Sequence, residues 1–273
     1  MSDDPGWAAN FSGQSMAAYE DTLVGPLFVP WGEQLLGVVG VGVGDAVLDV
    51  ACGPGTVARL AAARVGPTGS VVGCDLSDQM LSIARAKGEV DGAAIDYQLG
   101  SAESLSVESG VFDVALCQQG FQFFPDRIGA LTEMRRALRS GGRAGISVWC
   151  EIESCEPFAA LEVAIREVLG TADAASYRDG PWGLVDGDLL QGEMSAAGFA
   201  DVRLRRDEIT VGFDGPDHLI STLGAAPLGV KVQQLDASDR HAFRKAVKNA
   251  TATLIHDSVI HGRTTAHTVI GTA

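Results

Sequence analysis

Two carboxylates and two glycines are the residues of this chain best placed to bind a ligand. Asp49 lies near the end of an apolar run in VLDVACGPGTVARLA, residues 47–61, Gly53 and Gly55 follow it, and Asp75 ends the next run. Glycine has no Cβ, so its backbone can approach a ligand closely or take a positive φ. A carboxylate at the end of a second strand can accept hydrogen bonds from two ribose hydroxyls. The spacing therefore predicts a ligand that contains a ribose.

Two kinds of ribose ligand compete for this turn. A nicotinamide dinucleotide favours G-x-G-x-x-G, and the third glycine position holds Ala58 here, which that pattern tolerates. Asp49 distinguishes them better, because a carboxylate there would face a pyrophosphate badly but could hold a sulfonium or ammonium group, directly or through water. A glycine-containing connection without a ligand is the remaining alternative.

The elements that position these residues alternate along the chain. Short apolar runs without clean polar alternation predict strands covered on both faces. Between them, the patterns predict helices, one starting near Thr56 and another opening with Ser77 or Asp78 as N-cap. This alternation predicts an α/β fold with a doubly wound parallel sheet and right-handed crossovers. The predicted strands are residues 46–50, 70–75, 94–100, 112–118 and 143–149, and the helices also include 125–142.

The flanking segments are predicted to be mostly helical. Residues 14–39 have helical spacing interrupted by Pro26 and Pro30. Further helices are expected at 157–170, 187–198, 216–228 and 236–259, with strands at 201–213 and 265–273.

Composition limits the function classes. The 273 residues are 46% hydrophobic, and the net charge of −15 disfavours nucleic acid and anionic lipid surfaces. The one dense basic stretch, residues 135–143, is typical of a solvated helix end. No basic leader and no apolar run approaching a membrane span is recognised, and the five cysteines have no CxxC spacing. A cytoplasmic protein with a small-molecule partner is expected, with no membrane and no nucleic acid; a homodimer is left open.

Four motifs, LDVACGPGT, GCDLSDQML, GSAESL and FDVALCQQGFQFFPD, together resemble class I S-adenosylmethionine-dependent methyltransferases. The resemblance is to the small-molecule, quinone-biosynthesis-like branch (methyltransferase type 11). It implies a seven-stranded, mostly parallel sheet of order 3-2-1-4-5-7-6, with the last strand antiparallel. It also implies one Rossmann-like domain over 1–273, with an N-terminal lid (1–39), a cofactor-binding core (40–150) and helical cap segments (151–185 and 213–262).

The resemblance assigns cofactor contacts residue by residue. Asp49 is expected near the methionine end, Asp75 at the ribose and Leu76 against the adenine. Tyr19 and Trp31 are candidate lid residues. The full set implied for S-adenosylmethionine, and for its product S-adenosylhomocysteine, is Asp49, Ala51, Gly53, Gly55, Asp75, Leu76, Met80, Ser101, Ala102, Glu103, Gln118 and Gln119, to which the N-terminal helix adds the two lid candidates.

This chain departs from the family pattern at two positions. The family usually has an acid where this chain has Ser101, and that acid accepts from the adenine amino group. Serine can still accept a hydrogen bond, so weaker or water-mediated recognition is expected. Pro54 stands where a smaller or polar residue is common, and it stiffens the turn.

The expected reaction is methyl transfer to an O, C or N atom of a small, largely apolar acceptor. The Asn/Asp-Pro-Pro-Tyr/Phe element of nucleobase methyltransferases is replaced by CQQGFQFF, so Phe121, Phe123 and Phe124 are candidates for an apolar acceptor wall, or for core. No general base is evident; His218 and Glu151 are candidates. The alternative is a cofactor-binding relative that catalyses another reaction, such as a cyclisation, or acts in regulation.

No metal site is predicted. His256 and His261 are five residues apart on an expected helix and would not share a face. The cysteines fit no familiar zinc spacing. Four of them are expected at the carboxyl ends of strands, namely Cys52, Cys74, Cys117 and Cys150. Bound cofactor is expected to slow the alkylation of Cys52 and Cys117 relative to that of Cys155, which is expected on the cap.

Overall fold

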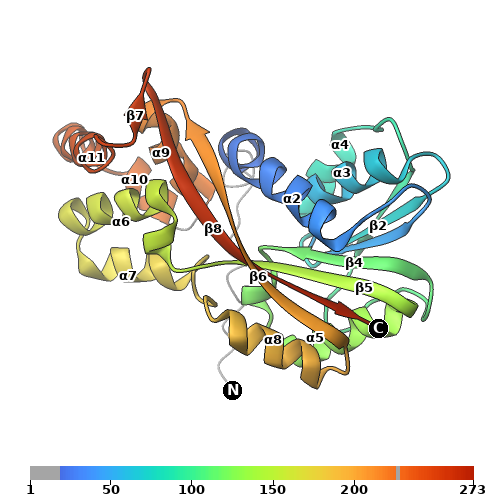
Figure 1. The fold of residues 1–273 in the computed structure, drawn as a ribbon. Coiled ribbons are helices and arrows are strands. Elements are labelled where there is room, and N and C mark those ends of the chain that lie inside the picture. The colour runs from blue at the N-terminus through green and yellow to red at the C-terminus, as the bar shows by residue number, and fades with distance from the viewer. Residues whose placement is uncertain (1–18, 226–227) are drawn as a thin grey trace. The chain divides into compact units, whose positions relative to one another are not determined.

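The computed structural model describes residues 19–225 and 228–273 and has the predicted α/β architecture (Figure 1). The chain divides into two compact units. Unit 1 comprises Met1–Phe28, Trp149–Val185 and Asp207–Ala266, and unit 2 comprises Val29–Val148, Asp186–Arg206 and His267–Ala273. Each unit is described by itself below.

The sheet has the strand order β3-β2-β1-β4-β5-β8-β6. The first five strands are mutually parallel. Bonds from Gly141 N–H to Ala273 O and from Cys150 N–H to Thr265 O show that β8 runs antiparallel to β5. The predicted order is therefore confirmed, and the additional β7 only pairs with β8. The strands are β1 (Ala46–Val50), β2 (Ser70–Asp75), β3 (Ile95–Leu99), β4 (Phe112–Gln118), β5 (Leu138–Trp149), β6 (Ala200–Phe213), β7 (Ile255–His256) and β8 (Val259–Thr272).

Helices cover both faces of the sheet in unit 2. On one face α2 and α3 enclose a core of aliphatic residues with β1, β2 and β4, and α5 and α8 lie on the other face (Figure 1). Side-chain caps start α4, where Ser77 accepts from Met80 N–H, and α5, where Asp126 accepts from Gly129 N–H. These helices are α2 (Val29–Val39), α3 (Thr56–Val65), α4 (Asp78–Ala86), η3 (Phe121–Phe123), α5 (Arg127–Ala137) and α8 (Gly187–Ala196).

One helix of unit 2 is shorter than predicted. The pattern over 125–142 predicted a helix, but α5 ends at Ala137, because Leu138 already pairs with Phe112 across the sheet. Ile128, in the first turn of α5, is 45% exposed.

Unit 1 is helical around the outer halves of β6 and β8. A buried aromatic group joins its helices, with Phe158 packing edge-on against Phe213 and 5.5 Å from Trp182, whose ring lies 5.4 Å from Tyr177. Glu162, buried on α6, accepts from Arg166 and Arg178. The elements are η2 (Glu20–Phe28), η4 (Ile152–Ser154), α6 (Glu156–Val168), α7 (Thr171–Asp179), α9 (Gly215–Ser221), η5 (Thr222–Ala225), α10 (Leu228–Gln233) and α11 (Ala237–Ala250).

The prediction of a helix over 236–259 is wrong beyond Ala250. There β7 and β8 form a hairpin, whose turn residues Asp257 and Ser258 have φ 49° and 69°. Both central residues with positive φ are typical of a tight turn matched to strand twist. His256 and His261 therefore lie on neighbouring strands, with ring centroids 6.4 Å apart.

The helical run Glu20–Val39 continues through both prolines. Pro26 lies inside the π-helical part η2, whose wider turn relieves the clash a proline causes in an α-helix. By length and hydropathy alone these 20 residues qualify as a membrane span, contrary to the expectation from sequence. Buried core helices pass the same test, and 44% of the apolar window is buried in the protein.

Candidate cofactor site

The turn between β1 and α3 has a backbone that few residue types adopt. Ala51, Gly53 and Gly55 have φ 57°, 53° and 78°. A Cβ at Gly53 would meet nothing within 4 Å, whereas one at Gly55 would lie 2.3 Å from the hydroxyl of Tyr97. Gly53 therefore leaves the backbone open to a ligand, and Gly55 is required by packing.

Asp49 is a buried acid in β1 with an unused acceptor. Its Oδ2 is buried and has no hydrogen-bond partner among the described residues. Burial, reinforced by the negative charge of Asp75, raises the pKa of Asp49 to about 8, although a hydrogen bond from the Ala58 backbone opposes the shift. A cation placed beside this carboxyl would favour its ionised form and supply the missing donor.

Asp75 ties the glycine turn to β2. Its Oδ2 accepts from Gly53 N–H at 2.8 Å, and its Oδ1 accepts from Ser77 N–H at 2.8 Å. Burial raises the pKa of Asp75, and these two backbone donors oppose that rise. Each carboxylate oxygen has a second lone pair, so both remain able to accept from a ligand.

Further polar atoms at this end of the sheet lack partners. Among described residues, the buried atoms without a hydrogen bond include Thr56 Oγ1, Tyr97 OH, Glu103 Oε1 and Gln119 Oε1. Tyr97 lies within β3, and the other three residues follow strands β1, β3 and β4. Buried polar atoms in folded proteins are nearly always paired, so a group of unpaired atoms indicates a place where a ligand or water completes the structure.

The segment after β2 offers an apolar surface beside these groups. Leu76 is 66% exposed directly after Asp75, and Met80, one turn into α4, is buried. An exposed leucine next to a partly buried acid suits a planar ring whose sugar reaches that acid. Ala102, after β3, is also buried.

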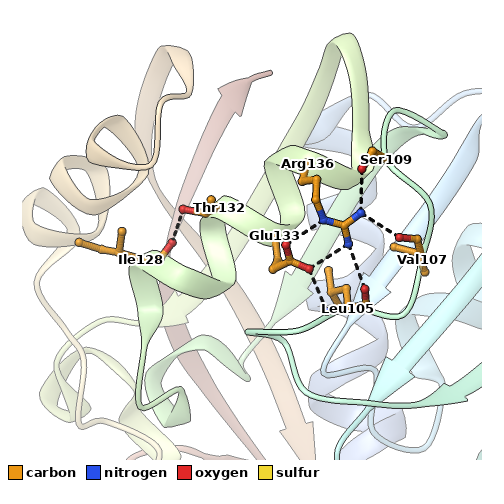
Figure 2. Close-up of polar contacts among 7 residues, drawn as sticks. All are labelled: Leu105, Val107, Ser109, Ile128, Thr132, Glu133 and Arg136. Carbon is orange, nitrogen blue, oxygen red and sulfur yellow. Dashed lines mark hydrogen bonds and ion pairs between the residues drawn. The ribbon is translucent and has the colours of Figure 1, made fainter.

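The loop after β3 is held by helix α5. Arg136 donates to the carbonyls of Leu105 and Val107 and to Ser109 Oγ, at 2.9 to 3.0 Å, and Glu133 accepts from Leu105 N–H at 3.0 Å (Figure 2). Glu133 and Arg136 also pair with each other, which lowers the pKa of Glu133. The loop that carries Ser101–Glu103 therefore has a fixed C-terminal anchor.

Comparison with known proteins identifies the family. A methyltransferase-domain family model matches residues 47–142. A demethylmenaquinone methyltransferase of Lactococcus lactis is 33% identical over 178 residues, which are 60% of this chain and 69% of that protein. The chain belongs to the class I S-adenosylmethionine-dependent methyltransferases.

Solved structures share the fold of this chain. Phosphoethanolamine N-methyltransferase 2 of Haemonchus contortus, in complex with phosphomonomethylethanolamine and S-adenosylhomocysteine, has a TM-score of 0.61 at 18% identity, covering 97% of this chain and 58% of that one. The [4+2]-cyclase SpnF has a TM-score of 0.51 at 19% identity, covering 89% and 81%. Proteins of Mycobacterium bovis and Mycobacterium tuberculosis are 31% identical to this chain, and the match covers 65% of their length.

The family cofactor, S-adenosylmethionine, fits the residues at this edge. The ammonium group of its methionine part would supply the donor that Asp49 Oδ2 lacks, and the open side of Gly53 leaves room for a ligand. The cofactor-contact assignments made from the sequence remain predictions, since they depend on where the cofactor lies.

The end of β4 carries the last of the predicted cofactor residues. Gln119 has φ 54°, donates from its backbone to Ser147 O at 2.9 Å and from Nε2 to Ser147 Oγ at 3.3 Å. Gln118 Oε1 lies 3.5 Å from the position a Cβ of Gly32 would take. A non-glycine residue held at positive φ is typical of a functional site.

The candidate acceptor wall divides into core and surface. Phe121 is fully buried and packs edge-on against Phe124, with ring centroids 5.4 Å apart. Phe123 and Phe124 are partly exposed. Phe121 is therefore core in this structure, and the other two are accessible.

The remaining candidates lie in different surroundings. Tyr19 stacks on Phe28 in unit 1, and Trp31 is fully buried in α2 of unit 2. Both nitrogens of His218 contact backbone, Nδ1 accepting from Asp214 N–H at 3.1 Å and Nε2 lying 3.2 Å from Thr22 O. These contacts leave His218 no free nitrogen to act as a base, and Glu151 is exposed at the start of η4.

The cysteines are all buried, which corrects one expectation. Cys52, Cys74, Cys117 and Cys150 lie at or just beyond strand ends, as predicted. Cys155, expected as an accessible reference on the cap, is instead fully buried where α6 begins, with Sγ 3.7 Å from Thr265 O. Burial raises the pKa of this thiol. Within residues 19–225 and 228–273, no group of three or more acidic, cysteine or histidine residues is arranged to hold a metal.

Sequence reasoning missed two contributors to the site. Tyr97 lies in β3, where an aromatic residue is expected for packing alone, and its hydroxyl reaches the glycine turn only through the parallel pairing of β2 and β3. The Glu133–Arg136 pair has the spacing of neighbours on a helix surface, which could have indicated a paired role. Its loop partners become visible only in the fold.

Proposed function

We propose that the protein transfers a methyl group from S-adenosylmethionine to an O, C or N atom of a small, largely apolar acceptor. The observation that carries this proposal is the buried, unpartnered oxygen of Asp49 beside an open glycine turn that Asp75 holds in place. We further propose a cytoplasmic protein that takes a small-molecule partner and no nucleic acid, consistent with its charge of −15.

Different residues of the chain would bind different parts of the cofactor. Asp49 would accept from the cofactor's ammonium group, Asp75 from its ribose, and Leu76 with Met80 would pack on its adenine. When bound, S-adenosylmethionine supplies an electrophilic methyl group on a sulfonium. The protein then has to orient the acceptor and exclude water, and a general base is optional for such a displacement.

The acceptor class rests on two supports. The Lactococcus lactis relative is named for a quinone acceptor. Phe123 and Phe124 offer accessible aromatic surface near the end of β4. A quinone-like or phenolic ring with an apolar substituent is therefore the first acceptor to test.

Turnover with labelled cofactor tests this function. The purified protein is incubated with S-adenosylmethionine carrying a ¹³C-methyl group and with demethylmenaquinone, a phenol, an amine or a nucleobase. Mass spectrometry should find the label in demethylmenaquinone or in the phenol, together with an equal amount of S-adenosylhomocysteine. The variant Asp49→Asn should lose this activity, whereas Asp91→Asn, at an exposed position, should keep it. Label in the nucleobase alone would contradict the proposal.

Cyclisation is the second candidate, because the [4+2]-cyclase SpnF has the same fold. The same reactions separate the two. A cyclase converts its substrate without forming S-adenosylhomocysteine, whereas a methyltransferase forms one molecule for each product molecule.

A further inference from the structure

The loop after β3 contains a carboxylate, Glu103, two residues beyond the position where the family usually has an acid. Ser101 occupies the position where the resemblance places an acid for the adenine amino group. Two residues later, Glu103 accepts from the hydroxyl of Ser101 through Oε2, while Glu103 N–H donates to Ser101 Oγ at 3.3 Å. The two residues therefore form a closed local pair.

The other carboxylate oxygen of this pair is unused. Glu103 Oε1 is buried and has no hydrogen-bond partner among the described residues. A carboxylate accepts hydrogen bonds only, so this oxygen requires a donor. The hydroxyl of Ser101 cannot serve as one, because it already donates to Oε2.

The backbone that carries this carboxylate is fixed at both ends. Gly100 N–H donates to Asp75 O at 3.0 Å, and Ser101 pairs with Ser104 as an isolated bridge. Beyond it, Leu105 is held by Glu133 and Arg136 (Figure 2). Asp75, the predicted ribose acid, therefore lies one backbone hydrogen bond from the loop, so a base attached to that ribose would lie close to Glu103.

We propose that Glu103, oriented by Ser101, replaces the missing family acid and accepts a hydrogen bond from the 6-amino group of the cofactor's adenine. This inference rests on the proposed cofactor site. It makes Glu103 a specificity-determining residue that favours a 6-aminopurine over a 6-oxopurine. A 6-oxo group cannot donate a hydrogen bond, so its oxygen would face the carboxylate oxygen of Glu103 without a proton between them.

Binding of two nucleosides tests the assignment without any turnover. Calorimetry measures the affinity of S-adenosylhomocysteine and of S-inosylhomocysteine, which has oxygen in place of the amino group. The wild-type protein should prefer the adenine form by roughly 10- to 100-fold, the range for a hydrogen bond to a charged group. In Glu103→Gln, whose amide can donate to the 6-oxo group, the ratio should fall to about one or reverse.

Matched variants separate recognition from folding. Ser101→Ala removes the hydroxyl that orients Glu103 and should give an intermediate ratio. Glu108→Gln, on the same loop but exposed, should keep the wild-type ratio. An unchanged ratio in Glu103→Gln, with wild-type affinity for S-adenosylhomocysteine, would overturn the role of Glu103 and leave the proposed function intact. If the wild-type protein bound neither nucleoside, the proposed function and this assignment would both be wrong.

Discussion

The carboxyl group of Asp49 is buried, so its ionised form is unfavourable unless a cation lies beside it. Burial raises its pKa to about 8 from the ordinary value of 3.8. Between these values the folded protein binds more protons than the unfolded chain does. The stabilisation associated with the bound proton is therefore fully present below about pH 4 and is lost as the pH rises through about 8.

Replacing the Asp49 carboxyl group with a neutral amide should raise the stability of the empty protein, although the same change removes the proposed contact with the cofactor. We expect Asp49→Asn to stabilise the empty protein at pH 8.5 by on the order of 2 kcal/mol or more, and to have a smaller effect at pH 4. Urea unfolding at both pH values measures the difference. Asp91→Asn is the exposed control. An equal effect of Asp49→Asn at the two pH values would mean that burial does not raise the pKa of Asp49 in the folded protein.

Asp75 has a structural and a predicted binding role on the same side chain. Asp75→Ala removes the acceptors of Gly53 N–H and Ser77 N–H together with the predicted ribose contact. Affinity for S-adenosylhomocysteine should fall roughly 30-fold or more. Asp75→Asn keeps one acceptor oxygen and should lose less. A loss below about threefold for Asp75→Ala, measured by calorimetry, would contradict the ribose assignment.

The strand–turn–helix element could be predicted closely from sequence. The observed β1 and α3 begin at Ala46 and Thr56, where the pattern placed them, because an apolar run followed by two glycines leaves the chain few conformations. The hairpin of β7 and β8 was missed, since IHDSVIH continues the apolar spacing of α11. The turn is made by Asp257 and Ser258, which both have positive φ. Because neither residue is a glycine, the sequence gives no clear signal for a turn at this point.

The two glycines of the turn should respond differently to alanine. Both have positive φ, so each substitution carries a backbone strain of about 1 kcal/mol. At Gly55 the new methyl group also meets the Tyr97 hydroxyl, whereas at Gly53 it meets open space. Chemical denaturation should therefore show Gly55→Ala to be the less stable variant, by about 1–3 kcal/mol relative to Gly53→Ala. Equal stabilities would contradict the close approach of Tyr97.

For the whole molecule, burial changes the expected thiol chemistry. All five cysteines are buried, and burial raises the pKa of Cys52, Cys74, Cys117 and Cys155. Because the thiolate is the reactive form, we expect alkylation of the native protein to be slow at every cysteine, Cys155 included. Mass-spectrometric labelling before and after denaturation measures this. Rapid labelling of Cys155 in the native protein would contradict its burial at the start of α6.

The sheet order could be anticipated from motifs, but the partners of side chains could not. The resemblance located Asp49, Asp75 and the glycines by position in the chain. It could not show that Asp75 accepts from Gly53 or that His218 contacts Thr22, because these residues lie 22 and 196 positions apart in the chain. Nor could it show that Ser101 holds Glu103, because that contact depends on the conformation of the loop. The lid role of Tyr19 and Trp31 and the acceptor role of the cap segments stay predictions.

A crystal structure of the protein with S-adenosylhomocysteine tests the central claim most directly. The account predicts that the ligand's ammonium group lies beside Asp49 Oδ2, its ribose beside Asp75 and its adenine against Leu76. Gly53 should contact the ligand through its backbone. The account would be contradicted if the ligand bound elsewhere and left Asp49 Oδ2 without a donor, or if crystals grown in saturating ligand showed none at the glycine turn.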